Sequence, residues 1–458
     1  MASSSLWRAT LTLLAGGAVA QALPLLLGPW LARLYTPEQF GAFTAFWVVA
    51  SNLAVVACLR YEFALPLERD SGHATAVLAL CLRVLAVSVL ISALLAALLA
   101  AGVAGWPVGW TGGDSAAVSA GVSAGTSAGT SAGISASSPA ADTRWPHAAW
   151  LPLAVAALGS CQLFTVWATR AERFEALAVG RVVQHGGGAL GQLGIGLAAG
   201  AAAAPTLGLI AAPIAAAAAA AAWLARSTGA GWTAALRRQP TGSLRAAARR
   251  QRAFPLFNAP HAFAGALQDT VAVGLLAAWA GDAAVGYWGL ALRYLKAPAT
   301  LVGGAVSQAL YPKLVAATPD QARRTVRQVM GLLAAVALPL AGLLMWFGPA
   351  LFGAVFGPRW REAGELARAL APYIALHFIA SPLAVVTMAW RAQAWALRLA
   401  LVGQLMFVAA LGLGLHLGGL IAAAWSVSLA MTIYFGWYFW KLATWPDVPP
   451  EVSDAQPI

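Results

Sequence analysis

The stretch AVGYWGLALRYLKAPATLVGGAVSQALY, residues 284–311, is long and apolar enough to cross a bilayer as one helix, yet it contains two cations. Arg293 and Lys296 lie near its middle. A charge at the bilayer centre costs about 2.5–3.5 kcal/mol on insertion scales, so such residues usually face a bundle interior or a watery cavity. Their three-residue spacing places both cations on one helix face. The stretch therefore predicts a positively charged cavity inside a helical membrane protein, which favours an anionic cargo.

The rest of the chain has the composition of a polytopic membrane protein. Of its 458 residues, 60% are hydrophobic and only 10% are charged, whereas a soluble domain carries about 25% charged residues. We predict an all-α protein with twelve transmembrane helices in two six-helix lobes around a central cavity. The predicted spans are residues 10–34, 41–59, 74–101, 148–169, 177–200, 205–225, 254–280, 284–311, 329–352, 367–390, 397–415 and 417–440.

The net charge of +12 follows largely from topology. With both termini in the cytoplasm, most of the 28 lysines and arginines fall in the inner loops, as the positive-inside rule requires. No soluble region is long enough to present a basic face, so we expect no nucleic-acid partner. The three cysteines, Cys58, Cys81 and Cys161, lie far apart in or beside apolar runs. They predict buried thiols and no metal site.

Two segments divide the chain into parts. Residues 111–145 contain the low-complexity repeat SAGVSAGTSAGTSAGISASS, which predicts a flexible periplasmic loop within the N-terminal six-helix lobe, residues 1–225. Residues 226–253 are rich in arginine and predict a cytoplasmic linker. The C-terminal six-helix lobe then covers residues 254–441, and residues 442–458 are expected to form a cytoplasmic tail.

The two predicted lobes share a short internal repeat. LARLYTPEQFGAF closes the first span and opens the second, and AAWAGDAAVGYWG does the same for the seventh and eighth. Aligning Gly41 with Gly286 superposes the two turns. Repeated halves are common in transporters, and their substrate site lies between the repeats.

The chain resembles the bacterial polysaccharide and O-antigen flippases. The resemblance rests on LYTPEQFGAFTAF, on LRYEFALPLERD, and on residues 254–317 with VGYWGLALR and APATLVGGAVSQALYPKL. The superfamily of these flippases also holds multidrug exporters and lipid-linked precursor flippases. The low-complexity loop departs from the family's usual short connection, and we interpret it as an insertion that leaves the fold unchanged.

The resemblance implies a transporter and not an enzyme. Similar proteins alternate between inward and outward openings and have no ATP site of their own. Their cargo is an oligosaccharide repeat unit on undecaprenyl pyrophosphate, which they move from the inner to the outer leaflet of the bacterial inner membrane. The pathway would be that of lipopolysaccharide O-antigen, capsule or exopolysaccharide. A polysaccharide polymerase and a chain-length regulator are candidate partners.

Arg293 and Lys296 are the first candidates for binding the pyrophosphate. Two cations on one face supply charge and several donors, and arginine suits a bidentate contact. The alternative is an ion pair with Asp269 in the seventh span. Asp269 is also a candidate for binding a coupling proton or sodium ion, because an intramembrane carboxylate is often functional. No other cofactor is expected.

Further charged residues have two interpretations each. Arg83, within the third span, would line the cavity or extend to the cytoplasmic surface. Arg60, at the inner end of the second span, would contact the phosphate during loading or belong to a solvated cluster with Glu62. The candidates for gate or interlobe contacts are Arg33, Glu38, Arg181 and His185.

Two other functions remain open on the sequence alone. A drug exporter of the same superfamily would be expected to carry more cavity carboxylates than cations. An integral-membrane polysaccharide polymerase would place catalytic arginines in a large outer loop, whereas the predicted one has a single arginine, Arg144. The run GGGALG, residues 186–191, has the spacing of a nucleotide-binding motif, but inside an apolar helix it predicts close helix packing.

Overall fold

A computed structural model describes residues 2–100, 147–200, 205–229, 232–233, 241–390 and 392–445. For residues 2–15, 241, 242, 261 and 393 the description covers the backbone alone. The predicted loop at 111–145 lies outside these ranges. Parts of the predicted linker and the tail beyond residue 445 also lie outside them.

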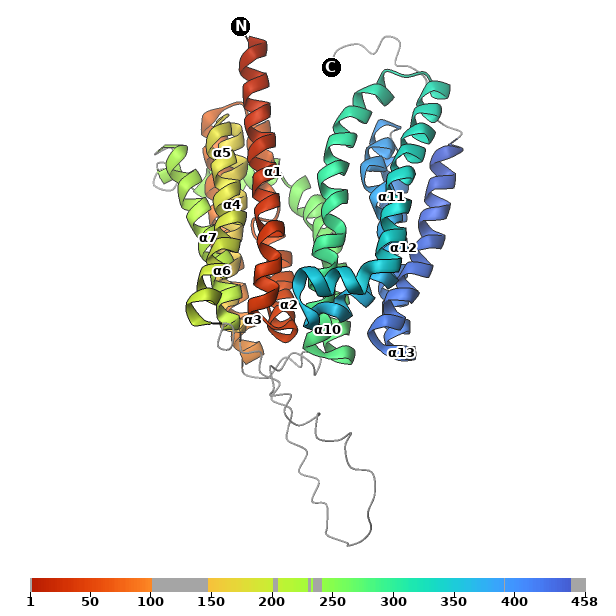
Figure 1. Cartoon of the computed structure of the whole chain (residues 1–458). Coiled ribbons are helices and arrows are strands. Elements are labelled where there is room, and N and C mark those ends of the chain that lie inside the picture. Colours follow the sequence, from red (N-terminus) through yellow and green to blue (C-terminus); the bar gives the residue numbers. More distant parts are fainter. Residues whose placement is uncertain are drawn as a thin grey trace, which may run out of the picture.

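The N-terminal half forms one bundle of helices (Figure 1). Its fifth span is a continuous run in which a π-helical turn, η4 (Val182–Gly186), joins α5 (Phe174–Arg181) to α6 (Gly187–Ala199). The other spans of this lobe are α1 (Ala2–Leu34), α2 (Pro37–Val55), α3 (Ser71–Ala100), α4 (Leu151–Arg170) and α7 (Thr206–Ser227).

The C-terminal half forms a second bundle, made of α10 (Ala259–Val315), α11 (Pro319–Phe356), α12 (Arg361–Ala389) and α13 (Gln393–Ala443). Two of these helices are each a pair of spans. The break in α10 falls at Gly281, with φ 83°, and that in α13 at Gly418 and Gly419, the latter with φ 73°. Positive φ favours glycine, which lacks a Cβ atom, so these residues permit the sharp turns between spans.

The described residues contain twelve spans. Seven helices are long and apolar enough to cross a membrane. Two of them, α10 and α13, divide into two spans each. The remaining three spans are α1, α2 and the run from α5 to α6. The prediction of an all-α fold with twelve helices in two lobes is confirmed.

Two helices begin at the same sequence signature, Thr-Pro-x-Gln. In α2, the Gln39 side chain accepts a hydrogen bond from the Thr36 backbone N–H at 2.9 Å, and Thr36 Oγ1 accepts one from the Gln39 N–H at 3.3 Å. In α11, the Gln321 side chain accepts from the Thr318 N–H at 3.2 Å. The capping side chains satisfy donors that have no partner within the helix, and proline suits the first helical position.

Small residues bring the helices of the N-terminal lobe close together. Gly188 packs against Pro213, and Gly191 against Ala212, so α6 lies tightly on α7. A Cβ atom at Gly191 would be 2.9 Å from the Ala212 methyl carbon, closer than side chains normally approach. The packing interpretation of GGGALG is therefore confirmed. The three cysteines are free and buried, as predicted.

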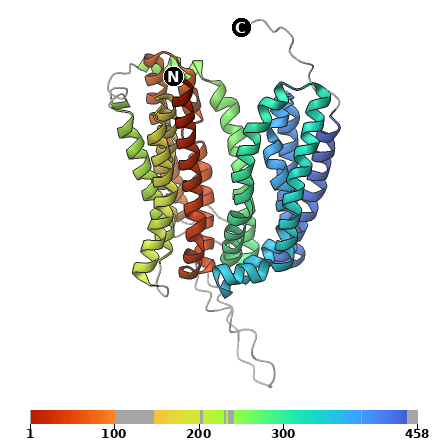
Figure 2. The ribbon, with the colours of Figure 1, turned by 45° about the horizontal axis from the view of Figure 1, so that its top comes forward.

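The two lobes meet at one end of the molecule and diverge toward the other (Figures 1 and 2). The meeting point, which we call the closed end, is where α1 passes into α2 and where α10 turns at Gly281. Gly41 and Gly286, the glycines aligned by the repeat, both lie in this contact. The opposite end carries η1 (Tyr61–Leu67) and α9 (Thr241–Arg250), so we call it the α9 end.

The predicted linker contains ordered structure. Its helix α9 packs against α3 of the N-terminal lobe, with Leu244 and Ala247 buried and Arg245 and Arg249 exposed. Beyond α9, the π-helical turn η5 (Phe254–Asn258) leads into α10. The linker is thus attached to the N-terminal lobe by an amphipathic helix. The arginine-rich composition of residues 226–253 did not predict this helix.

Candidate functional site

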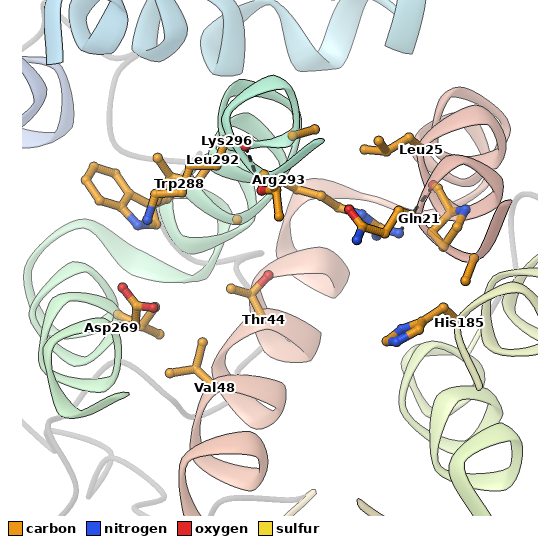
Figure 3. A pocket seen from close by; sticks show the side chains of 16 residues that line it. Gln21, Leu25, Thr44, Val48, His185, Asp269, Trp288, Leu292, Arg293 and Lys296 are labelled. Atoms are coloured by element: carbon orange, nitrogen blue, oxygen red, sulfur yellow. Dashed lines mark hydrogen bonds between the residues drawn. The ribbon is translucent and has the colours of Figure 1, made fainter. Parts of the chain in front are cut away.

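A cavity of about 470 Å³ lies between the lobes (Figure 3). Its walls come from α1 and α2, from the π turn η4, and from both halves of α10. The polar residues that line it are Gln21, Thr44, His185, Asp269, Arg293, Lys296 and Thr300. The two central cations predicted from the sequence therefore share one cavity, which we call the cationic cavity.

Arg293 extends across the cavity from α10 to α1. Its Nη2 donates to the backbone carbonyl of Pro24 at 3.2 Å. The neighbouring Tyr294 hydroxyl donates to the carbonyl of Leu25 at 2.6 Å. Both bonds join the C-terminal lobe to the N-terminal lobe.

The sequence of α1 explains why the Leu25 carbonyl is available. Pro29 has no backbone N–H, so the carbonyl four residues earlier, that of Leu25, lacks its helical donor. The Tyr294 hydroxyl takes the place of that donor. Gly28 provides the necessary space, because a Cβ atom there would overlap the tyrosine oxygen. Pro29, inside an apolar span, is the sequence feature that could have pointed to this contact.

Lys296 lines the cavity one turn beyond Arg293, and Asp269 lines it from the first half of α10 (Figure 3). Within the part of the chain that the structure describes, neither cation has a carboxylate oxygen within 4.0 Å. The alternative of an Asp269 ion pair with either cation is thus not formed. The cavity keeps two cations against one carboxylate, and both cations remain available to an anion.

Arg83 and Arg60 do not line the cationic cavity. Arg83 is exposed on α3. Arg60 adopts a left-handed backbone conformation, with φ 63°, at the α9 end, and its guanidinium lies 4.9 Å from the Phe63 ring centroid. Beside it, Glu62 is buried and accepts a hydrogen bond from Gln162 at 2.8 Å. Of the four predicted pyrophosphate ligands, the cavity brings together Arg293 and Lys296 only.

Arg33 makes an interlobe contact, but with backbone atoms. Its Nη2 donates to the carbonyls of Ala354 and Val355, at 3.4 and 3.3 Å, in the last turn of α11. A cation is favourable there because the terminal carbonyls of a helix lack intrahelical donors and carry partial negative charge. No ion pair between Arg33 and Glu38 occurs among the described residues, and Glu38 is exposed.

His185 and Arg181 have different environments although they lie one turn apart. His185 lines the cationic cavity from η4 (Figure 3). Arg181 is exposed, and a Cβ atom added at Gly17 of α1, within the same lobe, would lie 3.4 Å from its Nη1. Of these two predicted residues, only His185 lines the cationic cavity.

Aromatic side chains seal the closed end. Trp360 of η6 (Pro358–Trp360) is fully buried, and its indole N–H donates to the carbonyl of Ala32 at 2.6 Å. Its ring lies edge-on to Phe40 and to Tyr287, with centroids 5.1 and 5.9 Å apart. Nothing in the local sequence pointed to Trp360, because its hydrogen-bond partner, Ala32, lies 328 residues away along the chain. The cavity is thus shut on this side by contacts between the lobes.

These features define a multi-pass membrane protein with a transporter fold, built of two helical lobes around a cation-lined cavity. Comparisons with known proteins agree. The model of a family described as "Polysaccharide biosynthesis protein" matches residues 257–365, a segment that contains Arg293 and Lys296. The predicted resemblance to a polysaccharide-biosynthesis family is confirmed for this segment. A comparison with curated protein sequences gave no match.

Solved structures show the same fold over nearly the whole chain. The lipid II flippase MurJ in an inward closed conformation matches with a TM-score of 0.64 and 11% identity, covering 93% of this chain and 89% of that one. An inward-facing multidrug resistance MATE family transporter of the MOP superfamily matches with a TM-score of 0.60 and 13% identity, covering 93% and 96%. A Vibrio cholerae MATE transporter matches at 0.51 and 15%, covering 96% and 95%.

Proposed function

We propose that the protein is a flippase for an undecaprenyl-pyrophosphate-linked oligosaccharide, which it moves from the cytoplasmic to the periplasmic leaflet of the inner membrane by alternating access. One observation supports this most directly. Arg293 and Lys296 line a cavity between the lobes, and neither has a carboxylate partner among the described residues. Two cations kept in the middle of a membrane protein need an anion to compensate their charge.

Pyrophosphate suits this pair chemically. The Arg293 guanidinium is planar and offers two parallel donors to one phosphate, while the Lys296 ammonium adds a compact charge with three donors. Charge-assisted bonds of this kind contribute about 1.5–3 kcal/mol each. The polyprenyl tail would remain in the lipid, because the bilayer is apolar and the cavity is polar, so moving the tail into the cavity would not be favourable.

Alternating access fits the contacts that hold the closed end. Arg33, Arg293, Tyr294 and Trp360 each donate to a backbone carbonyl of the other lobe. Such bonds contribute about 1–3 kcal/mol net apiece, so the two lobes are held together by a small number of exchangeable contacts. Asp269 remains our candidate for a coupling proton or sodium ion. A polymerase and a chain-length regulator remain candidate partners at the periplasmic side.

A drug exporter of the same superfamily is the second candidate, because one of the solved folds that match is a multidrug transporter. The charge of the cavity argues against it. A cavity with two cations and one carboxylate repels the cationic compounds that such exporters carry, and binding them would require additional carboxylates.

The test is a chromosomal deletion, complemented with wild type or with Arg293→Ala, followed by extraction of lipid-linked intermediates. We expect complete repeat units on undecaprenyl pyrophosphate to accumulate in the inner leaflet, with surface polymer lost, in the deletion strain and with Arg293→Ala. The exposed Arg83→Ala serves as the matched control and should restore the polymer. Repeat units that reach the outer leaflet unpolymerised would instead indicate a polymerase, and unchanged polysaccharide would refute the proposal.

A further inference from the structure

A second cavity, of about 340 Å³, extends from Arg293 into the N-terminal lobe. It shares Pro24, Thr44, His185 and Arg293 with the cationic cavity, so the two cavities adjoin at these residues. Its remaining polar and aromatic lining comes from the middle of α2, from η4 and from α6, namely Phe43, Trp47, Gln184 and Gln192. We call it the N-lobe cavity.

One wall of the N-lobe cavity is an aromatic platform. The rings of Phe43 and Trp47, one helical turn apart, are stacked with centroids 5.7 Å apart and planes 27° apart. Both side chains are half-buried, and no described residue accepts a hydrogen bond from the Trp47 indole N–H. Aromatic faces carry negative potential and attract the weakly positive C–H groups of a saturated ring. A platform with a free donor at its edge is therefore suited to a sugar.

The lining also contains two amide side chains, Gln184 of the π turn η4 and Gln192 of α6. A π turn inserts one additional residue into a helix and is frequent at functional sites. Here it brings Gln184 and His185 to the cavity. Gln184 Oε1 accepts from the Cys161 thiol at 3.3 Å, and no described residue accepts from its amide NH₂ group. Gln192 is held in place because its amide donates to the Leu209 carbonyl at 2.8 Å.

The N-lobe cavity is positively charged at the end that contains Arg293 and neutral elsewhere. Its lining contains no carboxylate, and its one cation with fixed charge, Arg293, lies where the two cavities join. The interior beyond Arg293 thus offers neutral donors and acceptors beside an apolar platform. Small-molecule sites combine an apolar lining with a few polar groups in this way, and the volume suits a compact group better than a long chain.

We propose that the N-lobe cavity is a saccharide subsite, in which the sugar joined to the pyrophosphate stacks on Phe43 and Trp47 and bonds to Gln184. This rests on the proposed function, because Arg293 lines both cavities and would hold the phosphate to which that sugar is attached. Arg293 would thereby fix the position of the pyrophosphate in the cationic cavity relative to the sugar in the N-lobe cavity.

The experiment compares two probes on the purified full-length protein in lipid nanodiscs. One probe is undecaprenyl pyrophosphate, and the other is the undecaprenyl-pyrophosphate-linked saccharide fraction extracted from a strain that lacks this gene. We expect wild type to bind the saccharide lipid about tenfold more tightly than the bare lipid. Trp47→Ala and Gln184→Ala should bind both probes with the affinity that wild type has for the bare lipid. Arg293→Ala should weaken both.

Two control variants separate stacking from damage to the fold. Trp47→Phe keeps an aromatic ring on the platform and should retain most of the preference for the saccharide lipid. Trp346→Ala makes the same large truncation at an exposed position of α11 and should change neither affinity. The proposal is overturned if wild type binds the two probes equally, or if Trp47→Ala keeps the preference. It is also overturned if Trp47→Ala and Gln184→Ala lose affinity for both lipids equally. Failure of wild type to bind either lipid would instead remove the proposed function itself.

Discussion

Gly41 and Gly286 are in reciprocal contact at the closed end. Gly41 packs against the backbone carbonyl of Asp282, which starts the helix that carries Gly286. Gly286 packs in turn against the carbonyl of Pro37, which starts the helix that carries Gly41. Each glycine lies four residues after the carbonyl that the other contacts, so the contact has the self-complementary form of a two-fold interface. The short repeat noted in the sequence is therefore a pair of surfaces built to meet.

Either glycine, replaced by alanine, should force the lobes apart at this end. A Cβ atom at Gly41 would overlap the Asp282 carbonyl, and one at Gly286 would overlap that of Pro37. We expect Gly41→Ala and Gly286→Ala to destabilise the closed end equally, by about 1–3 kcal/mol. Spin labels on the exposed Glu38 and Glu362 should show a longer distance in both variants. Gly342→Ala, with no atom within 4 Å of the new Cβ, is the control, and an unchanged distance in both test variants would contradict the contact.

Tyr294→Phe should weaken the same end without adding bulk. The variant keeps the ring that packs on Phe356 and loses only the hydrogen bond to the Leu25 carbonyl. That carbonyl has no helical donor, but water can replace the hydroxyl when the lobes separate, so the loss should cost the net value of one hydrogen bond, about 1 kcal/mol. The spin-label distances should show a larger open population than in wild type, smaller than that of the glycine variants. The exposed Tyr311→Phe should have no effect, and an identical distribution in Tyr294→Phe would refute the role of the bond.

The carboxyl of Glu62 should make stability depend on pH. It lies in η1 between the spans, it is 1% exposed, and no described residue donates to its Oε2. Burial raises the pKa of Glu62, and Arg60 and the Gln162 bond lower it only in part. A raised pKa in the fold means that the protonated form is favoured. Its contribution is therefore present below the unfolded-state pKa and is lost as pH rises through the folded-state pKa.

Glu62→Gln should remove this dependence, because the amide has no charge to bury. We expect the variant to be more stable than wild type at pH 7–8, by roughly 1 kcal/mol, and the difference to shrink toward pH 4. Thermal unfolding in detergent at several pH values measures it. Glu362→Gln, at an exposed position, should follow wild type throughout. A Glu62→Gln curve parallel to that of wild type would refute the prediction.

Glu68 should hold the linker helix on the N-terminal lobe. Its Oε1 accepts from Gln251 at 2.7 Å, and its Oε2 lies 3.5 Å from the Arg250 guanidinium. Without these contacts α9 should detach more often, and trypsin should cleave after Arg249 and Arg250 roughly fivefold faster in Glu68→Ala. Asp320→Ala removes a comparable arginine pair, with Arg323, on another helix and should leave cleavage at α9 unchanged. Equal cleavage rates in wild type and Glu68→Ala would show that apolar packing alone retains the helix.

Much of the fold could be predicted because membrane spans carry a strong local signal. Apolar length identified the twelve spans, and the spacing of Arg293 and Lys296 placed both cations in one cavity. The direction of Arg83 could not be predicted, because α3 is apolar all round and its sequence does not say which face meets the lobe. The roles of Trp360 and Arg33 depend on contacts more than 300 residues apart. The π turn that presents Gln184 and His185 has no signature in composition.

Pro29 has a consequence for how the two lobes separate. In hydrocarbon an unpaired carbonyl costs several kcal/mol, so the Leu25 oxygen must exchange the Tyr294 hydroxyl for another donor whenever the lobes separate at the closed end. Among the described residues, Tyr294 is the side chain that donates to this oxygen, and Leu25 lines the cationic cavity, so we expect water to be the replacement donor. Separation of the lobes along α1 is therefore a hydration event. The state in which the closed end is open therefore contains water at the Leu25 carbonyl. Its population should fall when an excluded osmolyte lowers the water activity.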